Sequence, residues 1–128
     1  MSLRDSLKVL VVDDMSTSRG LITQSLEAAG IRNIQVADGA RQAMTIMAAG
    51  PIHLVISDYN MPEIDGLQLL EAIRRNPATQ RVAFIIVSGR IDQNLIQKGQ
   101  ALGLNNLIAK PFSNQDMLGC VEKVVGRV

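Results

Sequence analysis

Val9-Leu10-Val11-Val12-Asp13-Asp14 is the stretch that decides the fold, because a wholly apolar, mostly β-branched run ends there in two carboxylates. Comparable runs recur at residues 34–37, 54–57, 83–87 and 107–109. Two of them, 54–57 and 83–87, are almost as apolar as the first, which is typical of strands buried on both faces. The pattern predicts a parallel sheet covered by helices on both sides.

Segments with helical periodicity alternate with these runs. Residues 16–29 place Ile22, Leu26 and Ala29 on one face, and Gly30 follows as a helix-terminating residue. The same reasoning predicts helices over 40–49, 66–75, 92–102 and 113–126, the last behind a capping-box-like start at Ser113. Repeated βα units with right-handed crossovers indicate an α/β, doubly wound fold. The 128 residues suit one domain, and we expect no separate output domain.

Composition excludes several classes of function. The single Cys120 excludes an intrachain disulfide and, with a lone His53, argues against a zinc site. A net charge of +1 without a basic run argues against nucleic acid as a partner. No apolar run approaches the ~20 residues that span a bilayer, and the amino terminus does not resemble a signal peptide. We therefore expect a cytoplasmic protein, and we expect it to be a monomer.

Polar residues stand where the apolar runs end. The first run is followed by Asp13 and Asp14, the third by Asp58, the fourth by Ser88 and the fifth by Lys110. In an open α/β sheet the carboxyl ends of the strands line the binding crevice. We therefore expect three carboxylates, a hydroxyl and an ammonium group to meet at one edge.

This set of groups has a specific chemistry. Two carboxylates about 4 Å apart repel by roughly 1 to 4 kcal/mol, so three together hold a proton or recruit a cation. Oxygen ligands with open positions suit Mg²⁺, with Mn²⁺ as the second candidate. With Asp13 and Asp14 neutralised, Asp58 can act as a nucleophile towards phosphorus, and Lys110 and Ser88 can stabilise the phosphoryl oxygens.

Each residue also has a simpler interpretation when taken alone. Asp13 or Asp14 could cap the following helix, and Asp58 could begin a turn. Lys110 could be an ordinary surface lysine, and Ser88 could belong to a turn with the glycine after it. Only their combination at one predicted edge favours the phosphoryl-transfer interpretation.

The sequence resembles the receiver domains of two-component response regulators, most closely the single-domain chemotaxis (CheY-like) type. The motifs that carry this resemblance are Val11-Val12-Asp13-Asp14, Asp58-Tyr59-Asn60-Met61-Pro62, Asp65-Gly66, Ser88-Gly89 and Ala109-Lys110-Pro111-Phe112. The resemblance covers essentially the whole chain. It implies one receiver domain over residues 1–128, with a flavodoxin-like (βα)5 sheet in the order 2-1-3-4-5.

The resemblance also implies a role for each acidic residue. Asp58 would accept a phosphoryl group from the phosphohistidine of a chemotaxis-type histidine kinase. The ligands of Mg²⁺ would be Asp14, Asp58 and the backbone carbonyl of Asn60, with Asp13 acting mainly through a water molecule. Family members undergo self-catalysed phosphorylation and dephosphorylation, yet they are signalling domains and not enzymes in the usual sense.

Further roles follow from the same resemblance. Ser88 would turn towards the phosphoryl group and Lys110 would pair with it. The Lys110–Pro111 peptide bond would be cis. The side chains of Asn60 and Arg90 would tune the rate of hydrolysis.

One position departs from the family pattern. Many members carry Tyr or Phe three places before the lysine, and this chain has Leu107 there. A docking surface is expected at Arg90, Ile91, Gln97, Asn105, Leu107, Phe112 and Cys120, because Leu107 and Cys120 suggest an apolar streak. The alternative for Cys120 is a small core residue. The partner of this surface could be a flagellar motor switch protein or a phosphatase, or the protein could serve as a phosphate sink for the kinase.

Three other classes of protein share parts of this pattern. A flavodoxin-like nucleotide carrier is disfavoured because Asp13 and Asp14 would repel a phosphate and the chain has few aromatic residues to stack on a flavin. An aspartate-nucleophile phosphatase usually places its nucleophile after the first strand and carries a cap, for which there is no room. A phosphorylation-independent scaffold would normally have lost part of the acidic set. Separately, Asp38 is predicted to cap the helix that follows it.

Overall fold

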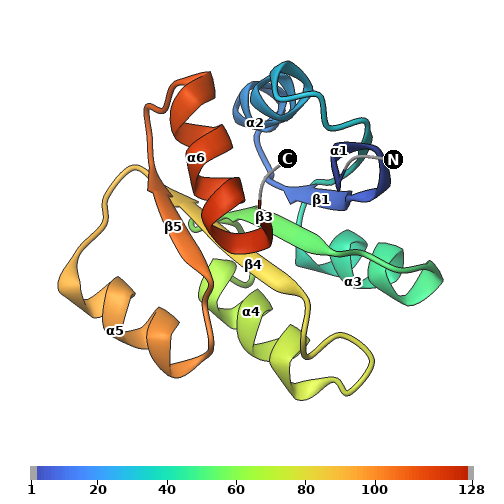
Figure 1. Cartoon of the computed structure of the whole chain (residues 1–128). Helices are drawn as coiled ribbons and strands as arrows, with labels where there is room; N and C mark the ends of the chain where they lie inside the picture. Colours follow the sequence, from blue (N-terminus) through green and yellow to red (C-terminus); the bar gives the residue numbers. More distant parts are fainter. Residues whose placement is uncertain (1–2, 127–128) are drawn as a thin grey trace.

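The computed structural model describes residues 3–126, which form a five-stranded parallel sheet in the order β2-β1-β3-β4-β5 (Figure 1). The strands are β1 (Lys8–Val12), β2 (Asn33–Ala37), β3 (Leu54–Asp58), β4 (Ala83–Ser88) and β5 (Asn106–Ala109). The helices are α1 (Leu3–Ser6), α2 (Ser16–Ala28), α3 (Ala40–Ala49), α4 (Gly66–Arg75), α5 (Gln93–Ala101) and α6 (Asn114–Val125). The predicted doubly wound fold and strand order are confirmed.

Helices cover both faces of the sheet. In Figure 1, α2 and α6 lie on one side, and α3, α4 and α5 lie on the other. The central strands β1, β3 and β4 are buried along almost their whole length, as their apolar sequences predict. No helix within residues 3–126 is long and apolar enough to cross a membrane.

Two hydrophobic cores form because alternate residues of each strand point to opposite faces of the sheet. Leu10 and Val12 of β1 join the core beneath α3, α4 and α5, together with Phe84 of β4. Val9 and Val11 join the core beneath α2 and α6. At the carboxyl ends of the strands, polar residues replace the apolar side chains of both cores.

The boundaries differ from the sequence prediction at a few residues. Asp58 and Ser88 are the last residues of β3 and β4, because Asp58 still pairs with Val87 and Ser88 with Ala109. The single-turn helix α1 is too short to show a periodicity and was not predicted. Gly30 has a positive φ of 86° after α2, as expected for a glycine that ends a helix.

The helix caps confirm one prediction and correct another. Ser113 caps α6 in a capping box with Asp116, as its sequence indicates. Asp38 does not cap α3, since the cap position is occupied by Gly39 and no side chain bonds there. Instead, the backbone N–H of Asp38 donates to the side-chain oxygen of Gln42, 2.7 Å away. A side chain from the first turn of α3 thus bonds to the backbone before the helix.

Candidate functional site

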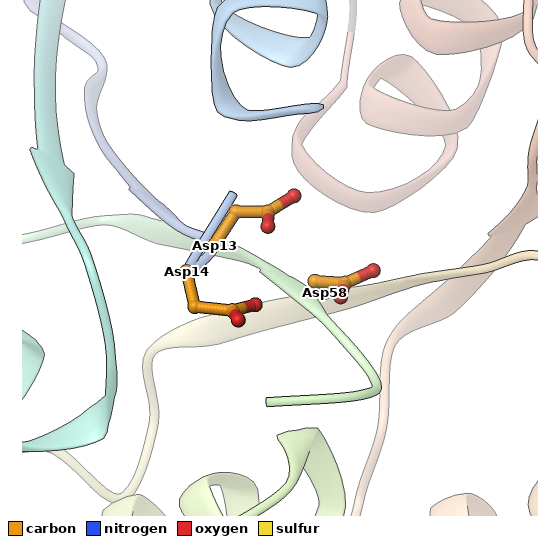
Figure 2. A group of neighbouring side chains, drawn as sticks. All are labelled: Asp13, Asp14 and Asp58. Carbon is orange, nitrogen blue, oxygen red and sulfur yellow. The ribbon is translucent and has the colours of Figure 1, made fainter. Parts of the chain in front are cut away.

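Three carboxylates meet at the carboxyl edge of the sheet. Asp13 and Asp14 follow β1, and Asp58 ends the neighbouring strand β3. One oxygen from each of the three lies within 4.8 Å of the others, and Figure 2 shows the three carboxylates extending towards the same side. The adjacency of β1 and β3 in the sheet brings these residues together although they are far apart in sequence. The predicted acidic cluster therefore exists.

Asp13 is the most constrained member of the cluster. Its side chain is fully buried, and its backbone N–H donates to the carbonyl oxygen of Ala37 in β2, 3.0 Å away. Its Oδ1 accepts from the backbone N–H of Met15 at 3.0 Å, whereas its buried Oδ2 has no hydrogen-bond partner among residues 3–126. A buried carboxylate oxygen without a partner is costly unless a cation completes it. The donor set therefore fits a hard divalent cation that prefers oxygen ligands.

Asp58 is paired with the ammonium group predicted from the sequence. The ammonium of Lys110 donates to Asp58 Oδ1 at 2.7 Å; the Asp58 side chain is largely shielded from solvent, whereas that of Lys110 is partly exposed. Burial raises the pKa of Asp58 above its usual range, and the charges of Asp13 and Asp14 act in the same direction. Lys110 opposes this shift in pKa without reversing it. The carboxylate is thus held where its negative charge is poorly compensated by the protein alone.

Lys110 reaches Asp58 because the backbone after β5 remains attached to β4. The backbone N–H of Lys110 donates to the carbonyl oxygen of Ser88, 2.9 Å away. The Lys110–Pro111 peptide bond is cis, as the resemblance implied.

A glycine supports the chain that follows Asp58, and sequence reasoning did not assign it this role. The N–H of Gly66 donates to the carbonyl oxygen of Tyr59 at 2.8 Å. A Cβ atom at Gly66 would lie only 2.8 Å from the backbone oxygen of Asp58 and 3.2 Å from the Cα of Tyr59. The Asp65-Gly66 pair at a helix start was the available signal, since Asp65 caps α4 and the glycine permits the close approach.

Within the described residues, neither the side chain of Ser88 nor that of Asn60 makes a hydrogen bond to the Asp58 carboxylate. The hydroxyl of Ser88 donates to the carbonyl oxygen of Arg90 at 2.7 Å and accepts from the N–H of the same residue at 3.2 Å. Asn60 is exposed and lines, with Asp14, an open hollow of about 530 Å³. The hydroxyl of Ser88 is therefore engaged by the backbone of Arg90. It has to give up its hydrogen bond to the Arg90 carbonyl before it can donate to a group attached to Asp58.

The predicted docking surface is corrected at Cys120. This residue is 8% exposed on the inner side of α6, and its Sγ lies 3.8 Å from the carbonyl oxygen of Leu107, so it cannot extend an apolar streak. Burial raises the pKa of the Cys120 thiol to about 11. The interpretation as a small core residue is the one that the structure supports, because Cys120 follows the helical spacing of Met117 and Val121.

The other residues of that surface do not form one apolar patch. Leu107 and Ile91 are half-buried against the core beneath α3, α4 and α5, whereas Phe112 packs on the opposite core. Arg90 and Gln97 are exposed, and so is Asn105, whose side-chain oxygen accepts from the N–H of Phe84 at 2.8 Å. A docking surface formed by these residues would therefore be mainly polar.

Comparison with known proteins agrees with this geometry. Residues 9–122 match the family of response regulator receiver domains. A probable chemotaxis protein CheY from Rhizobium etli is 45% identical over 126 residues, which are 98% of each chain. The chemotaxis protein CheY of Pseudomonas aeruginosa is 30% identical over 122 residues, which cover 95% of this chain and 98% of the relative.

Solved structures lead to the same family. The chemotaxis protein CheY4 of Vibrio cholerae superposes with a TM-score of 0.87 at 26% identity, over 93% of this chain and 98% of that chain. A putative response regulator from Chloroflexus aurantiacus superposes with a TM-score of 0.86 at 26% identity, over 94% of this chain and 98% of that chain. With this fold, this acidic edge and these relatives, the chain belongs to the response regulator receiver domain family.

Proposed function

We propose that this protein is a cytoplasmic response regulator that accepts a phosphoryl group on Asp58 from the phosphohistidine of a chemotaxis-type histidine kinase. The observation that carries the proposal is the arrangement of Asp58, paired with Lys110 at 2.7 Å and one of three carboxylates within 4.8 Å of one another. The buried, unpartnered Oδ2 of Asp13 supports a divalent cation at the same place. Bound Mg²⁺, held by Asp14, Asp58 and the backbone carbonyl of Asn60 and by Asp13 mainly through a water molecule, would supply positive charge against the carboxylates and the incoming phosphoryl group.

The residues of the chain then have defined tasks in the transfer. An oxygen of Asp58 forms a bond to phosphorus while the phosphorus–nitrogen bond of the donor breaks, and the electron pair of that bond stays on the imidazole nitrogen. The ammonium of Lys110, already beside Asp58, is positioned to pair with a phosphoryl oxygen. Ser88 exchanges the carbonyl oxygen of Arg90 for another phosphoryl oxygen, which draws the loop after β4 towards the site.

Two candidate outputs follow from this change. In the first, movement of the loop at Arg90 alters a docking surface for a motor switch protein or a phosphatase. In the second, the protein drains phosphoryl groups from the kinase as a sink. Leu107 favours the second candidate, because this leucine has no hydroxyl and lies half-buried against the core.

A transfer assay tests the acceptor role directly. Purified protein is incubated with radiolabelled acetyl phosphate, or with phosphorylated candidate kinases, with Mg²⁺ and with EDTA. We expect hydroxylamine-sensitive label only with Mg²⁺, and none in Asp58→Asn. The matched control is Asp65→Asn, a nearby carboxylate outside the cluster whose capping role asparagine can fill. Label that persists in Asp58→Asn, or no label in the native protein with any donor, would contradict the proposal.

A further inference from the structure

The turn between β1 and α2 is held by an arginine that takes no part in the phosphoryl transfer. The Nη1 of Arg19 donates to the backbone carbonyl oxygen of Asp13 at 2.8 Å. Arg19 lies in α2, and its own N–H donates to the carbonyl oxygen of Met15 at 2.9 Å. One residue thus connects both ends of the segment that carries Asp13 and Asp14.

This turn needs such support because its helix start is poorly capped. The cap position of α2 is Met15, whose side chain makes no capping hydrogen bond, and the first turn of α2 contains no acidic residue. A capping side chain normally stabilises the helix start and fixes the entry of the chain into the helix. A hydrogen bond from a charged donor is roughly twice as strong as one between neutral groups, so the bond from Arg19 can fix this turn in place of a capping side chain.

With Arg19 in place, Asp13 is fixed at three points. Its N–H is bound to Ala37, its carbonyl oxygen to Arg19 and its Oδ1 to the N–H of Met15. Within the part of the chain that the structure describes, Oδ2 of Asp13 has no hydrogen-bond partner, and this carboxylate belongs to the cluster with Asp14 and Asp58. A carboxylate fixed in this way loses less freedom when it takes up a cation.

We infer that Arg19 is a positioning residue for the divalent cation, acting through the backbone of Asp13 to hold the Asp13–Asp14 segment ready for metal. The inference rests on the proposed function, since it assigns the control of metal affinity at the same site. Removing a hydrogen-bond partner from the outer shell of a metal site typically lowers metal affinity about 10- to 100-fold. We expect a loss of about tenfold for Arg19→Met, at the lower end of that range, because that variant keeps the aliphatic stem and removes only the donor.

The test measures Mn²⁺ binding to the unphosphorylated protein from the electron paramagnetic resonance signal of the free ion. Arg41→Met is the matched control, because Arg41 is an exposed arginine of α3 whose carbonyl accepts from Thr45, just as that of Arg19 accepts from Thr23. We expect about tenfold weaker binding for Arg19→Met, partial recovery for Arg19→Lys, and native affinity for Arg41→Met.

A purely stabilising arginine would give a different result. In that case Arg19→Met would lower the melting temperature, while the folded protein would bind Mn²⁺ with native affinity, and the inference would be overturned. The inference also fails if Arg19→Lys binds no better than Arg19→Met, because a donor to Asp13 would then be irrelevant. If the native protein itself binds no Mn²⁺ and takes up no phosphoryl group, the proposed function fails, which is a distinguishable outcome.

Discussion

The charged groups at the amino ends of the strands (the amino edge) and at their carboxyl ends (the carboxyl edge) are compensated to different degrees within the chain. At the amino edge, the guanidinium of Arg74 donates to the carbonyl oxygens of Gln80, Val82 and Gly103 and to the side-chain oxygen of Asn105, at 2.6 to 3.1 Å. At the carboxyl edge, three carboxylates lie together with one ion pair among them, to Lys110, and Asp13 keeps a buried oxygen without a partner. One edge is satisfied within the chain, and the other is not.

The difference separates a structural charge from a functional one. Arg74 joins the end of α4 to the segments that enter β4 and β5, and burial only lowers the pKa of a group that remains charged. The carboxyl edge keeps repulsion that the fold alone does not relieve, and such sites are stabilised by what they bind. Removing a charge at the two edges should therefore affect stability with opposite sign.

The largest effect is expected at the amino edge. Arg74→Met should lower the free energy of unfolding by about 2 to 3 kcal/mol, because it removes charge-assisted bonds to three backbone carbonyls. Urea denaturation measures this change. The neighbouring Arg75→Met is the control, because Arg75 is paired with Glu71 in an exposed i,i+4 contact at 3.0 Å, worth about 0.5 kcal/mol or less. Phosphoryl uptake by folded Arg74→Met should be unchanged. A loss of uptake would show that Arg74 affects the site at the carboxyl edge.

A steric change at the carboxyl edge should be next in size. Gly66→Ala places a Cβ atom 2.8 Å from the backbone oxygen of Asp58. We therefore expect the free energy of unfolding to fall by about 1 to 2 kcal/mol and phosphorylation of Asp58 to be slower. Gly20→Ala in α2, where a Cβ would meet nothing within 4 Å, should instead raise stability by about 0.5 to 1 kcal/mol. Thermal melts of both variants show whether each substitution lowers or raises stability. Equal stability of the two variants would show that the loop after Asp58 adapts freely.

Removing the charge of Asp58 should stabilise the protein. Because burial raises the pKa of Asp58 in the folded state, the folded protein binds the proton more readily than the unfolded chain does. That stabilisation is complete below the unfolded pKa of about 3.9 and is lost as the pH rises through the folded pKa. At pH 7 in EDTA, Asp58→Asn should therefore have a larger free energy of unfolding than the native protein, because asparagine carries no charge to bury.

Urea denaturation at several pH values checks this prediction. The difference in free energy of unfolding between Asp58→Asn and the native protein should shrink towards pH 4. Asp92→Asn serves as the control, since Asp92 caps α5 through the N–H of Leu95 at 2.9 Å and asparagine caps equally well. An Asp58→Asn protein that is less stable at pH 7 would mean that the pair with Lys110 outweighs burial.

The smallest effect concerns a group that is buried without charge. Because burial raises the pKa of Cys120 to about 11, its thiol is neutral at pH 7 and shielded from reagents. A thiol reagent should label it only after unfolding, and Cys120→Ala should cost less than about 1 kcal/mol. Rapid labelling of the native protein would place Cys120 on the surface and return it to the docking surface.

Most of the fold could be predicted because the signals are local. The apolar runs mark the buried strands, and Gly30 and Ser113 mark helix ends through their own backbone and side-chain chemistry. The acidic edge was also predictable, because parallel strands bring their carboxyl ends together whatever lies between them. The order of the strands came from a family resemblance, and the structure confirms it.

The predictions that failed depend on which side of an element a residue occupies. Cys120 fits a surface or a core position equally well until the packing of α6 is known. Asp38 has the chemistry of a cap, but the chain turns so that Gly39 occupies the cap position. The close contact of Gly66 with the backbone of Asp58 joins two elements and leaves no periodic trace in the sequence.

The sequence by itself determined the alternation of strands and helices and which chemical groups end each strand, because hydrophobic periodicity and residue chemistry are properties of short segments. Only the tertiary structure decided that Asp13 keeps one oxygen without a partner, that Ser88 bonds to Arg90, and that Arg19 holds the turn before α2. These facts depend on how each turn is oriented and what surrounds it, which are set when the helices pack on the sheet.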